Sequence, residues 1–179
     1  NGEDVRPPPA DLPPPPEEPR VWSRDEIIDW CIQRSEDEGL PWTLLLACGI
    51  AESNLNQYAR RPTDPLLDDE YWPDVSMGVF QQTVRWAAGY PGDNEFPGPD
   101  IVTEIGDRYY NFEFALEAAV PQLKYWWNQE HDVVNALCRY NWPARDPLTN
   151  PNRQNYLRGF KEAQDIVTAR SGDLVEIPP

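Results

Sequence analysis

Basic side chains are scarce in this sequence of 179 residues. Fifteen Lys and Arg residues stand against 31 Asp and Glu residues, which gives a formal net charge of −16 at pH 7. Nucleic-acid binding depends on Lys and Arg displacing counterions from phosphates, and anionic membrane surfaces attract polybasic segments. The composition therefore argues against nucleic acid and against an anionic membrane surface as partners.

Patterns typical of metal sites and membrane spans are also missing. The sequence contains no C-x-x-C, and its one histidine is distant from any cysteine pair, so we expect no zinc site. The three cysteines are Cys31, Cys48 and Cys138. We expect them to be buried or free thiols, with one disulfide at most. No run approaches the ~18 consecutive apolar residues of a membrane-spanning helix.

Proline is abundant and divides the chain. Eight of the 21 prolines fall within the first 20 residues, among Glu and Asp. Such a run favours extended polyproline II, and we interpret it as a stiff tether in preference to a ligand for an SH3-type domain. We therefore expect a linker over 1–20, one domain over 21–170 and a tail over 171–179. The chain begins with Asn1 and shows no signal peptide, so we expect it to be a piece of a longer protein. We expect the domain itself to be monomeric.

The domain is predicted to be mainly helical, with long loops and little or no sheet. Ser23 and Glu26 have the spacing of a capping box, which predicts a helix that stops at Gly39. The segment from Trp42 to Ala51 is apolar nearly all round, which is typical of a central, buried helix.

Later helices are predicted from cap residues. They begin at Asn111, Asp132 and Asn150, with Pro121 expected to kink the first of them. A short helix is also expected over 82–88, and loops over 56–75 and 91–99. No segment shows sustained two-residue alternation, so no strand is predicted.

Glu52 is the most informative residue, because it ends the apolar helix. Burial and the negative end of the helix dipole both disfavour the ionised carboxylate, so we expect a raised pKa. A carboxyl group that keeps its proton near neutral pH suits general-acid cleavage of a glycosidic bond. The alternative is an ordinary surface glutamate at a helix end.

Three segments follow Glu52-Ser53 in order: Ser76-Met77-Gly78-Val79-Phe80-Gln81, Arg139-Tyr140-Asn141 and Asn155-Tyr156. The set resembles the lysozyme-like superfamily, specifically the soluble lytic transglycosylase domain, with goose-type lysozymes as near relatives. That family has Glu-Ser at the end of a buried helix, then a Gly-Leu-Met-Gln segment, an Ala-Tyr-Asn segment and a late Tyr. The resemblance spans roughly residues 20–170 and implies a lysozyme-like helical domain with a cleft.

The resemblance implies Glu52 as the sole catalytic acid and base, with no metal or cofactor. The residues that it places at the substrate are Ser53, Ser76, Gly78, Phe80, Gln81, Tyr140, Asn141 and Tyr156. In this interpretation Ser53 holds the carboxyl group or contacts the sugar, and the hydroxyl of Tyr156 points toward Glu52. The sequence leaves open whether Phe80, Gln81 and the two tyrosines belong instead to the core or to a helix cap. Candidates for stacking on sugar rings are Tyr71, Trp72, Trp126 and Trp127.

The implied reaction is cleavage of the bond between N-acetylmuramic acid and N-acetylglucosamine in peptidoglycan by a lytic transglycosylase. A goose-lysozyme-type hydrolase is the near alternative, and Asp64 and Asp74 are then the candidates for a second carboxylate. A non-catalytic glycan-binding or structural module is the alternative from another class. We expect the protein in the cell envelope, outside the cell, or in a phage virion.

The sequence also departs from the family pattern. Phe80 replaces the usual Met, Arg139 replaces a small or aromatic residue, and Trp142-Pro143 replaces a small, glycine-containing continuation. We expect these differences to change substrate preference and cleft shape more than the fold.

Overall fold

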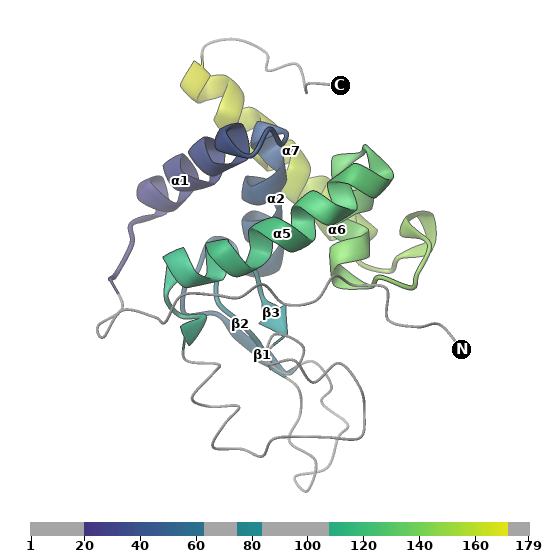
Figure 1. Ribbon diagram of the computed structural model, residues 1–179, viewed down its shortest axis with the longest axis horizontal. Coiled ribbons are helices and arrows are strands. Elements are labelled where there is room, and N and C mark those ends of the chain that lie inside the picture. The colour runs from purple at the N-terminus through teal and green to yellow at the C-terminus, as the bar shows by residue number, and fades with distance from the viewer. Residues whose placement is uncertain (1–19, 63–74, 84–107, 172–179) are drawn as a thin grey trace, which may run out of the picture.

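The computed structural model describes residues 20–62, 75–83 and 108–171. In these ranges the helices are α1 (Arg24–Asp37), α2 (Trp42–Ser53), α5 (Phe112–Glu130), α6 (Val133–Asn141), the 3-10 helix η1 (Pro147–Thr149) and α7 (Arg153–Ser171). The strands β1 (Arg60–Pro62), β2 (Val75–Met77) and β3 (Gln82–Thr83) form one antiparallel sheet in that order. The protein is therefore mainly helical, as predicted, with a small sheet at one end (Figure 1).

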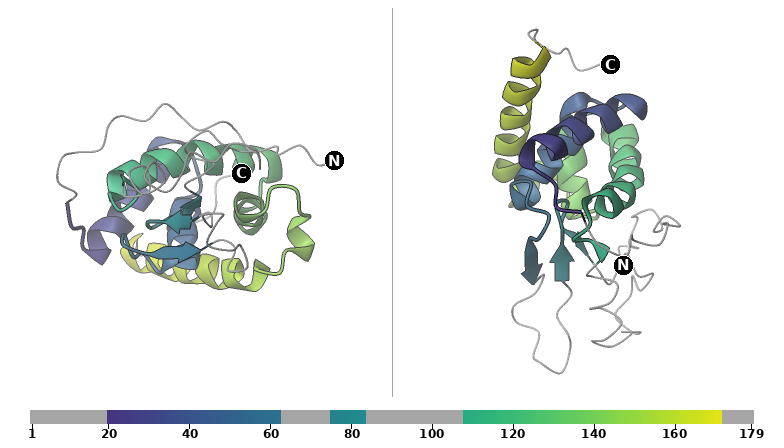
Figure 2. Two further views of the ribbon diagram at one scale, coloured as in Figure 1. Left: turned by 90° about the horizontal axis from the view of Figure 1, so that it is seen from below. Right: turned by 90° about the vertical axis from the view of Figure 1, so that its left-hand side faces the viewer.

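Helix α2 forms the centre of the core. Every residue from Thr43 to Ile50 is buried, which agrees with the nearly continuous apolar sequence. Helices α1 and α7 pack along α2, and α5 and α6 contact it as well (Figure 2). Gly159 of α7 permits close approach, because an added Cβ would lie 2.9 Å from both the Ala47 carbonyl oxygen and the Ala51 Cβ.

Three of the four cap residues that predict helices act as N-caps in the structure, and the prediction is wrong at Asn150, which is the C-cap of η1, because a 3-10 turn ends there and α7 begins only at Arg153. Ser23 and Glu26 form the reciprocal capping box of α1, which ends at Asp37 just before Gly39. Asn111 caps α5, which continues through Pro121 to Glu130. Asp132 caps α6, and Pro41 occupies the N-cap position of α2 without a side-chain hydrogen bond. Local sequence signals thus set most helix starts.

The prediction is wrong at the sheet. Gln82 and Thr83, expected to begin a helix, form β3 and pair with Met77 and Ser76 of β2. The expected loop over 56–75 contains β1 and ends at the first residue of β2. Strands of two or three residues are too short to show alternation, so the sequence carries no signal for them. The remainder of the predicted helix, 84–88, lies outside the described residues, as do 1–19, 91–99 and 172–179.

The three cysteines are buried free thiols, as expected. Burial raises the thiol pKa of Cys31, of Cys48 and, to a smaller extent, of Cys138, so these groups remain protonated. Among the described helices, none combines the length and apolar character needed to cross a membrane.

Candidate functional site

The chain turns sharply at the end of α2, one residue after the candidate acid. Asn54 and Leu55 both have a positive φ, of 54° and 61°, and the Leu55 N–H donates to the Gly49 carbonyl. A Cβ on Gly49 would lie 2.8 Å from Leu55 Cδ2 and 3.0 Å from Val79 Cγ1, so a larger residue would force these two side chains to shift. The turn leaves Glu52 in the last helical turn, half-buried.

Tyr156 of α7 contacts the Glu52 carboxyl group directly. Its hydroxyl donates to Glu52 Oε1 at 2.5 Å, across 104 residues of sequence. The phenol is only 2% exposed. Burial first, then the negative charge of Glu52 and this hydrogen bond, hold the pKa of Tyr156 well above its ordinary value. Tyr156 is therefore a protonated donor fixed on one carboxyl oxygen.

Ser53 contacts the turn that follows β2. Its Oγ lies 2.7 Å from the Val79 carbonyl oxygen and 3.2 Å from the Gly49 carbonyl oxygen, and it accepts from the Asn56 N–H at 3.1 Å. Ser53 thus joins the end of α2 to the 78–81 turn. These contacts fix the backbone that follows Glu52.

The 78–81 turn is built by two of the predicted site residues. Gly78 has a φ of +80°, and a Cβ there would lie 2.2 Å from the Tyr109 carbonyl oxygen. Gln81 is buried with a φ of 48°, and its amide donates to the carbonyls of Ala59 and Gly78 at 3.2 and 3.0 Å. Ser76 is buried in β2 beside this turn. These residues shape the backbone next to the acid, and the described contacts of Gln81 are with backbone.

Phe80 and Tyr140 join the turn to the core and to α6. The Phe80 side chain is fully buried and stacks on Phe112. Phe80 therefore belongs to the core, which is one of the two possibilities that the sequence leaves open for it. Its carbonyl oxygen accepts from the Tyr140 hydroxyl at 2.8 Å. Burial, with smaller contributions from Cys48 and Glu52, raises the pKa of Tyr140. Tyr140 therefore lies within electrostatic range of the candidate acid and remains a neutral donor.

Asn141 ends α6 with an exposed side chain. Its Oδ1 accepts from the amides of Asn150 and Asn152 at 3.3 and 3.1 Å, which connects α6 to the start of α7. Asn155, two residues into α7, donates to the Ala51 carbonyl at 2.8 Å. The sequence contains Asn155 within the late Tyr segment, but nothing in it indicates this contact with the last turn of α2.

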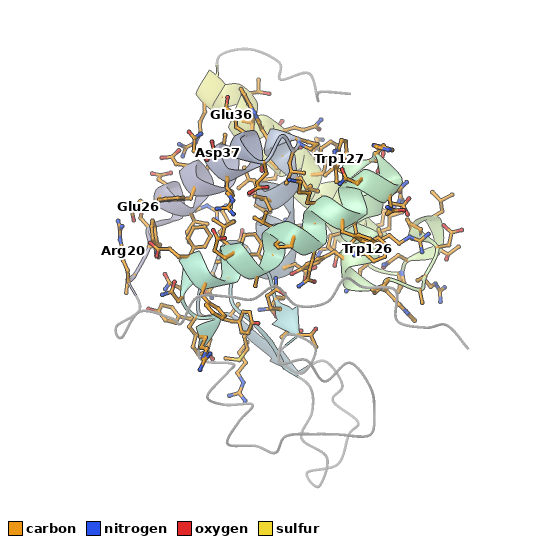
Figure 3. The ribbon with its side chains drawn as sticks, in the orientation of Figure 1. Arg20, Glu26, Glu36, Asp37, Trp126 and Trp127 are labelled. Atoms are coloured by element: carbon orange, nitrogen blue, oxygen red, sulfur yellow. The ribbon has the colours of Figure 1, made fainter. Side chains whose placement is uncertain are left out.

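The structure thus connects four separate segments to one another and to the end of α2, through the contacts of Tyr156 with Glu52, of Ser53 with Val79, of Tyr140 with Phe80 and of Asn155 with Ala51. The predicted site residues in these segments are Glu52, Ser53, Ser76, Gly78, Phe80, Gln81, Tyr140 and Tyr156, whereas the side chain of Asn141 contacts Asn150 and Asn152. Asp64, Asp74, Tyr71 and Trp72 lie outside the described residues. Trp126 and Trp127 belong to α5 and are buried, so as placed they offer no ring face to a sugar (Figure 3). The exposed tryptophan beside Asn141 is Trp142, which was not among the stacking candidates.

Within ranges 20–62, 75–83 and 108–171, no group of three or more His, Cys, Asp and Glu side chains could hold a metal ion. A hollow of about 520 Å³ lies between α1, α7 and the start of α2, where Trp42 and Arg170 line it. Trp42 begins α2 and Glu52 is near its end, so this hollow is at the opposite end of the helix from the candidate acid.

In the part of the chain that the structure describes, the site presents the carboxyl group of Glu52 at the end of a buried helix, with one oxygen held by a buried phenol. Such a group can donate a proton and take one back. Comparisons of the chain with protein-family models, with curated proteins and with solved structures find no match in any of the three.

Proposed function

We propose that the protein is a lytic transglycosylase that cleaves the β-1,4 bond from N-acetylmuramic acid to N-acetylglucosamine in peptidoglycan. The observation that carries this proposal is the contact between Glu52 Oε1 and the Tyr156 hydroxyl at the end of α2. Its place of action is the cell envelope, reached from outside the cell or from a phage virion. The resemblance of four ordered segments supports the choice of substrate, and the contact of Tyr156 with Glu52 supports the choice of Glu52 as the acid.

In the first step Glu52 acts as the acid. Because Tyr156 donates to Oε1, we place the transferable proton on Oε2. The proton goes to the glycosidic oxygen, and the bond from this oxygen to C1 of the muramic ring breaks, with its electron pair leaving on the oxygen. The acetamido oxygen of the same ring bonds to C1 and supports the developing positive charge. No second carboxylate is required.

In the second step Glu52 acts as the base. The ionised carboxylate, stabilised by the Tyr156 hydrogen bond, removes the proton from the C6 hydroxyl of the muramic ring. The C6 oxygen then bonds to C1 while the bond from the acetamido oxygen to C1 breaks. A 1,6-anhydro ring forms, Glu52 regains its proton and no water is consumed.

The direct test is digestion of purified peptidoglycan followed by mass analysis of the muropeptides. We expect products that end in 1,6-anhydromuramic acid. Reducing muramic ends would contradict the transglycosylase and assign a hydrolase instead. Peptidoglycan that binds the protein without being cleaved would assign a non-catalytic module.

Replacing Tyr156 with phenylalanine tests the hydrogen bond to the acid. The phenol stabilises the ionised form of Glu52, so its removal raises the pKa of this carboxyl group. A general acid loses activity as pH rises through its pKa, so the alkaline fall of the pH–rate profile moves to higher pH. We also expect about tenfold slower turnover, the lower end of what a hydrogen bond to a charged group contributes.

The measurement is the pH dependence of the rate of peptidoglycan digestion. Tyr125→Phe, which removes the hydroxyl of an exposed tyrosine on α5, is the matched control and should leave the profile unchanged. An unshifted alkaline limb in Tyr156→Phe would show that the phenol does not act on the ionisation that limits activity.

A further inference from the structure

Trp142 is an exposed aromatic residue next to the candidate site. It follows Asn141 directly as the C-cap of α6, and it is 45% exposed. An exposed tryptophan leaves a large apolar surface in water, at a cost that a binding role can offset. The two tryptophans of α5 that had been candidates for sugar stacking are buried, so they do not provide this surface.

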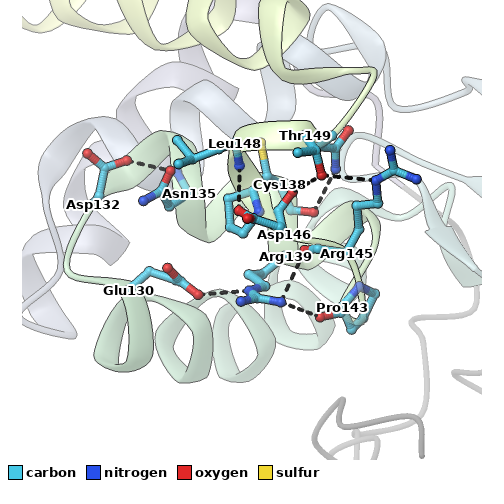
Figure 4. A network of polar contacts seen from close by, with 12 residues as sticks. Glu130, Asp132, Asn135, Cys138, Arg139, Pro143, Arg145, Asp146, Leu148 and Thr149 are labelled. Carbon is cyan, nitrogen blue, oxygen red and sulfur yellow. Dashed lines mark hydrogen bonds and ion pairs between the residues drawn. The ribbon is translucent and has the colours of Figure 1, made fainter. Parts of the chain in front are cut away.

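The segment that carries Trp142 is braced by Arg139. The Arg139 guanidinium pairs with Glu130 at 2.8 Å, and its Nη1 donates to the carbonyls of Pro143 and Arg145 at 2.9 and 3.1 Å (Figure 4). Each of these interactions involves a charged group, which strengthens it. Arg139, one of the residues that depart from the family pattern, therefore fixes the backbone that follows Trp142.

The next part of the segment is held as well. Asp146 caps η1 by accepting from the Leu148 N–H at 2.9 Å, and Arg145 donates from Nε to Thr149 at 3.2 Å. The Arg145 guanidinium lies 5.1 Å from the centre of the Trp142 ring, a cation–π distance. The ring is thus supported by a cation and presented on a braced segment, which lowers the entropy lost on binding.

The segment that leads into Trp142 contacts the turn beside Glu52. Two residues before Trp142, the Tyr140 hydroxyl donates to the Phe80 carbonyl of the 78–81 turn at 2.8 Å. The neighbouring carbonyl, that of Val79, accepts from Ser53, which follows Glu52 in sequence. The aromatic surface and the acid are therefore connected through one turn of backbone.

We propose that Trp142 forms a saccharide subsite, in which its ring stacks on an N-acetylated hexosamine ring of the glycan strand. This inference rests on the proposed function and adds a binding position to it. Stacking on the apolar face of a sugar needs no positive charge on the protein. It therefore suits this chain, which has few basic residues and a net charge of −16. Arg139 and Arg145 then act as positioning residues for the ring.

The test is binding of the peptide-free tetrasaccharide GlcNAc-MurNAc-GlcNAc-MurNAc, measured by calorimetry in the Glu52→Gln background so that it is not cleaved. We expect Trp142→Ala to weaken binding about tenfold, or 1.4 kcal/mol, and Trp142→Phe to weaken it about threefold. Trp30→Ala is the matched control, since Trp30 of α1 is 46% exposed, and its affinity should equal that of the background. Circular dichroism checks that each variant is folded.

Two results would overturn the subsite in different ways. If Trp142→Ala binds the tetrasaccharide as tightly as its background, the subsite is wrong and the proposed function stands. If the background itself does not bind the sugar, the proposed function fails and the subsite with it. Self-association of the unmutated chain that Trp142→Ala abolishes, with sugar affinity unchanged, would assign the ring and the 71% exposed Leu148 to an interface between copies.

Discussion

Glu52→Gln is expected to reduce the rate of peptidoglycan cleavage about 10³-fold or more while leaving the fold intact. The proposed mechanism uses this one carboxyl group twice, as acid and then as base, and each such role contributes typically about 10²–10⁴-fold. Glutamine keeps the shape of the side chain and an amide oxygen that can accept from the Tyr156 hydroxyl at the position of Oε1. The variant should therefore remain folded and bind glycan strands without cleaving them.

The measurement is the release of soluble muropeptides, with urea unfolding of the same samples. Glu38→Gln is the matched control, because Glu38 is a half-buried carboxylate at the C-cap of α1 that pairs with Arg34 and Lys124. This control should lose some stability and keep its activity. If Glu52→Gln digests peptidoglycan at an undiminished rate, position 52 does not carry the catalytic acid.

Most of the helical part of the fold can be predicted from local sequence. Ser23, Asn111 and Asp132 each accept the hydrogen bond of an N-cap in the structure, because capping depends on residues a few positions apart. The apolar segment that becomes α2 is buried because no face of it offers a polar surface to water. The short strands could not be predicted, since two or three residues are too few to show the alternation that marks a strand.

The candidate site is only partly accessible to the same reasoning. That Tyr156 meets Glu52 is expected from the resemblance alone, since no spacing rule connects residues 104 positions apart. Ser53 and Gln81 both make hydrogen bonds with backbone carbonyls. These contacts occur in turns with positive φ angles, which the sequence does not reveal. The contrast between buried Trp126 and exposed Trp142 is likewise a consequence of tertiary packing that composition does not show.

The turn beside the acid leads to a prediction about stability. Gly78 is required there for two reasons: its φ of +80° disfavours any L side chain, and an added Cβ would lie 2.2 Å from the carbonyl oxygen of Tyr109. A backbone oxygen cannot rotate away as a flexible side chain can, so the turn or the segment at Tyr109 has to move. We expect Gly78→Ala to lower the free energy of unfolding by about 3 kcal/mol or more, as strain and overpacking add.

Gly39→Ala separates these two causes. Gly39 has a similar φ of +67°, but no atom lies within 4 Å of a Cβ added there, so the substitution introduces strain without a collision. We expect it to cost about 1 kcal/mol in urea unfolding and to leave activity unchanged. Gly78→Ala should in addition lose activity in its folded fraction, because Val79 and Phe80 hold Ser53 and Tyr140 through their carbonyls. Equal losses of stability in the two variants would show that the Tyr109 carbonyl does not confine the turn that supports Glu52.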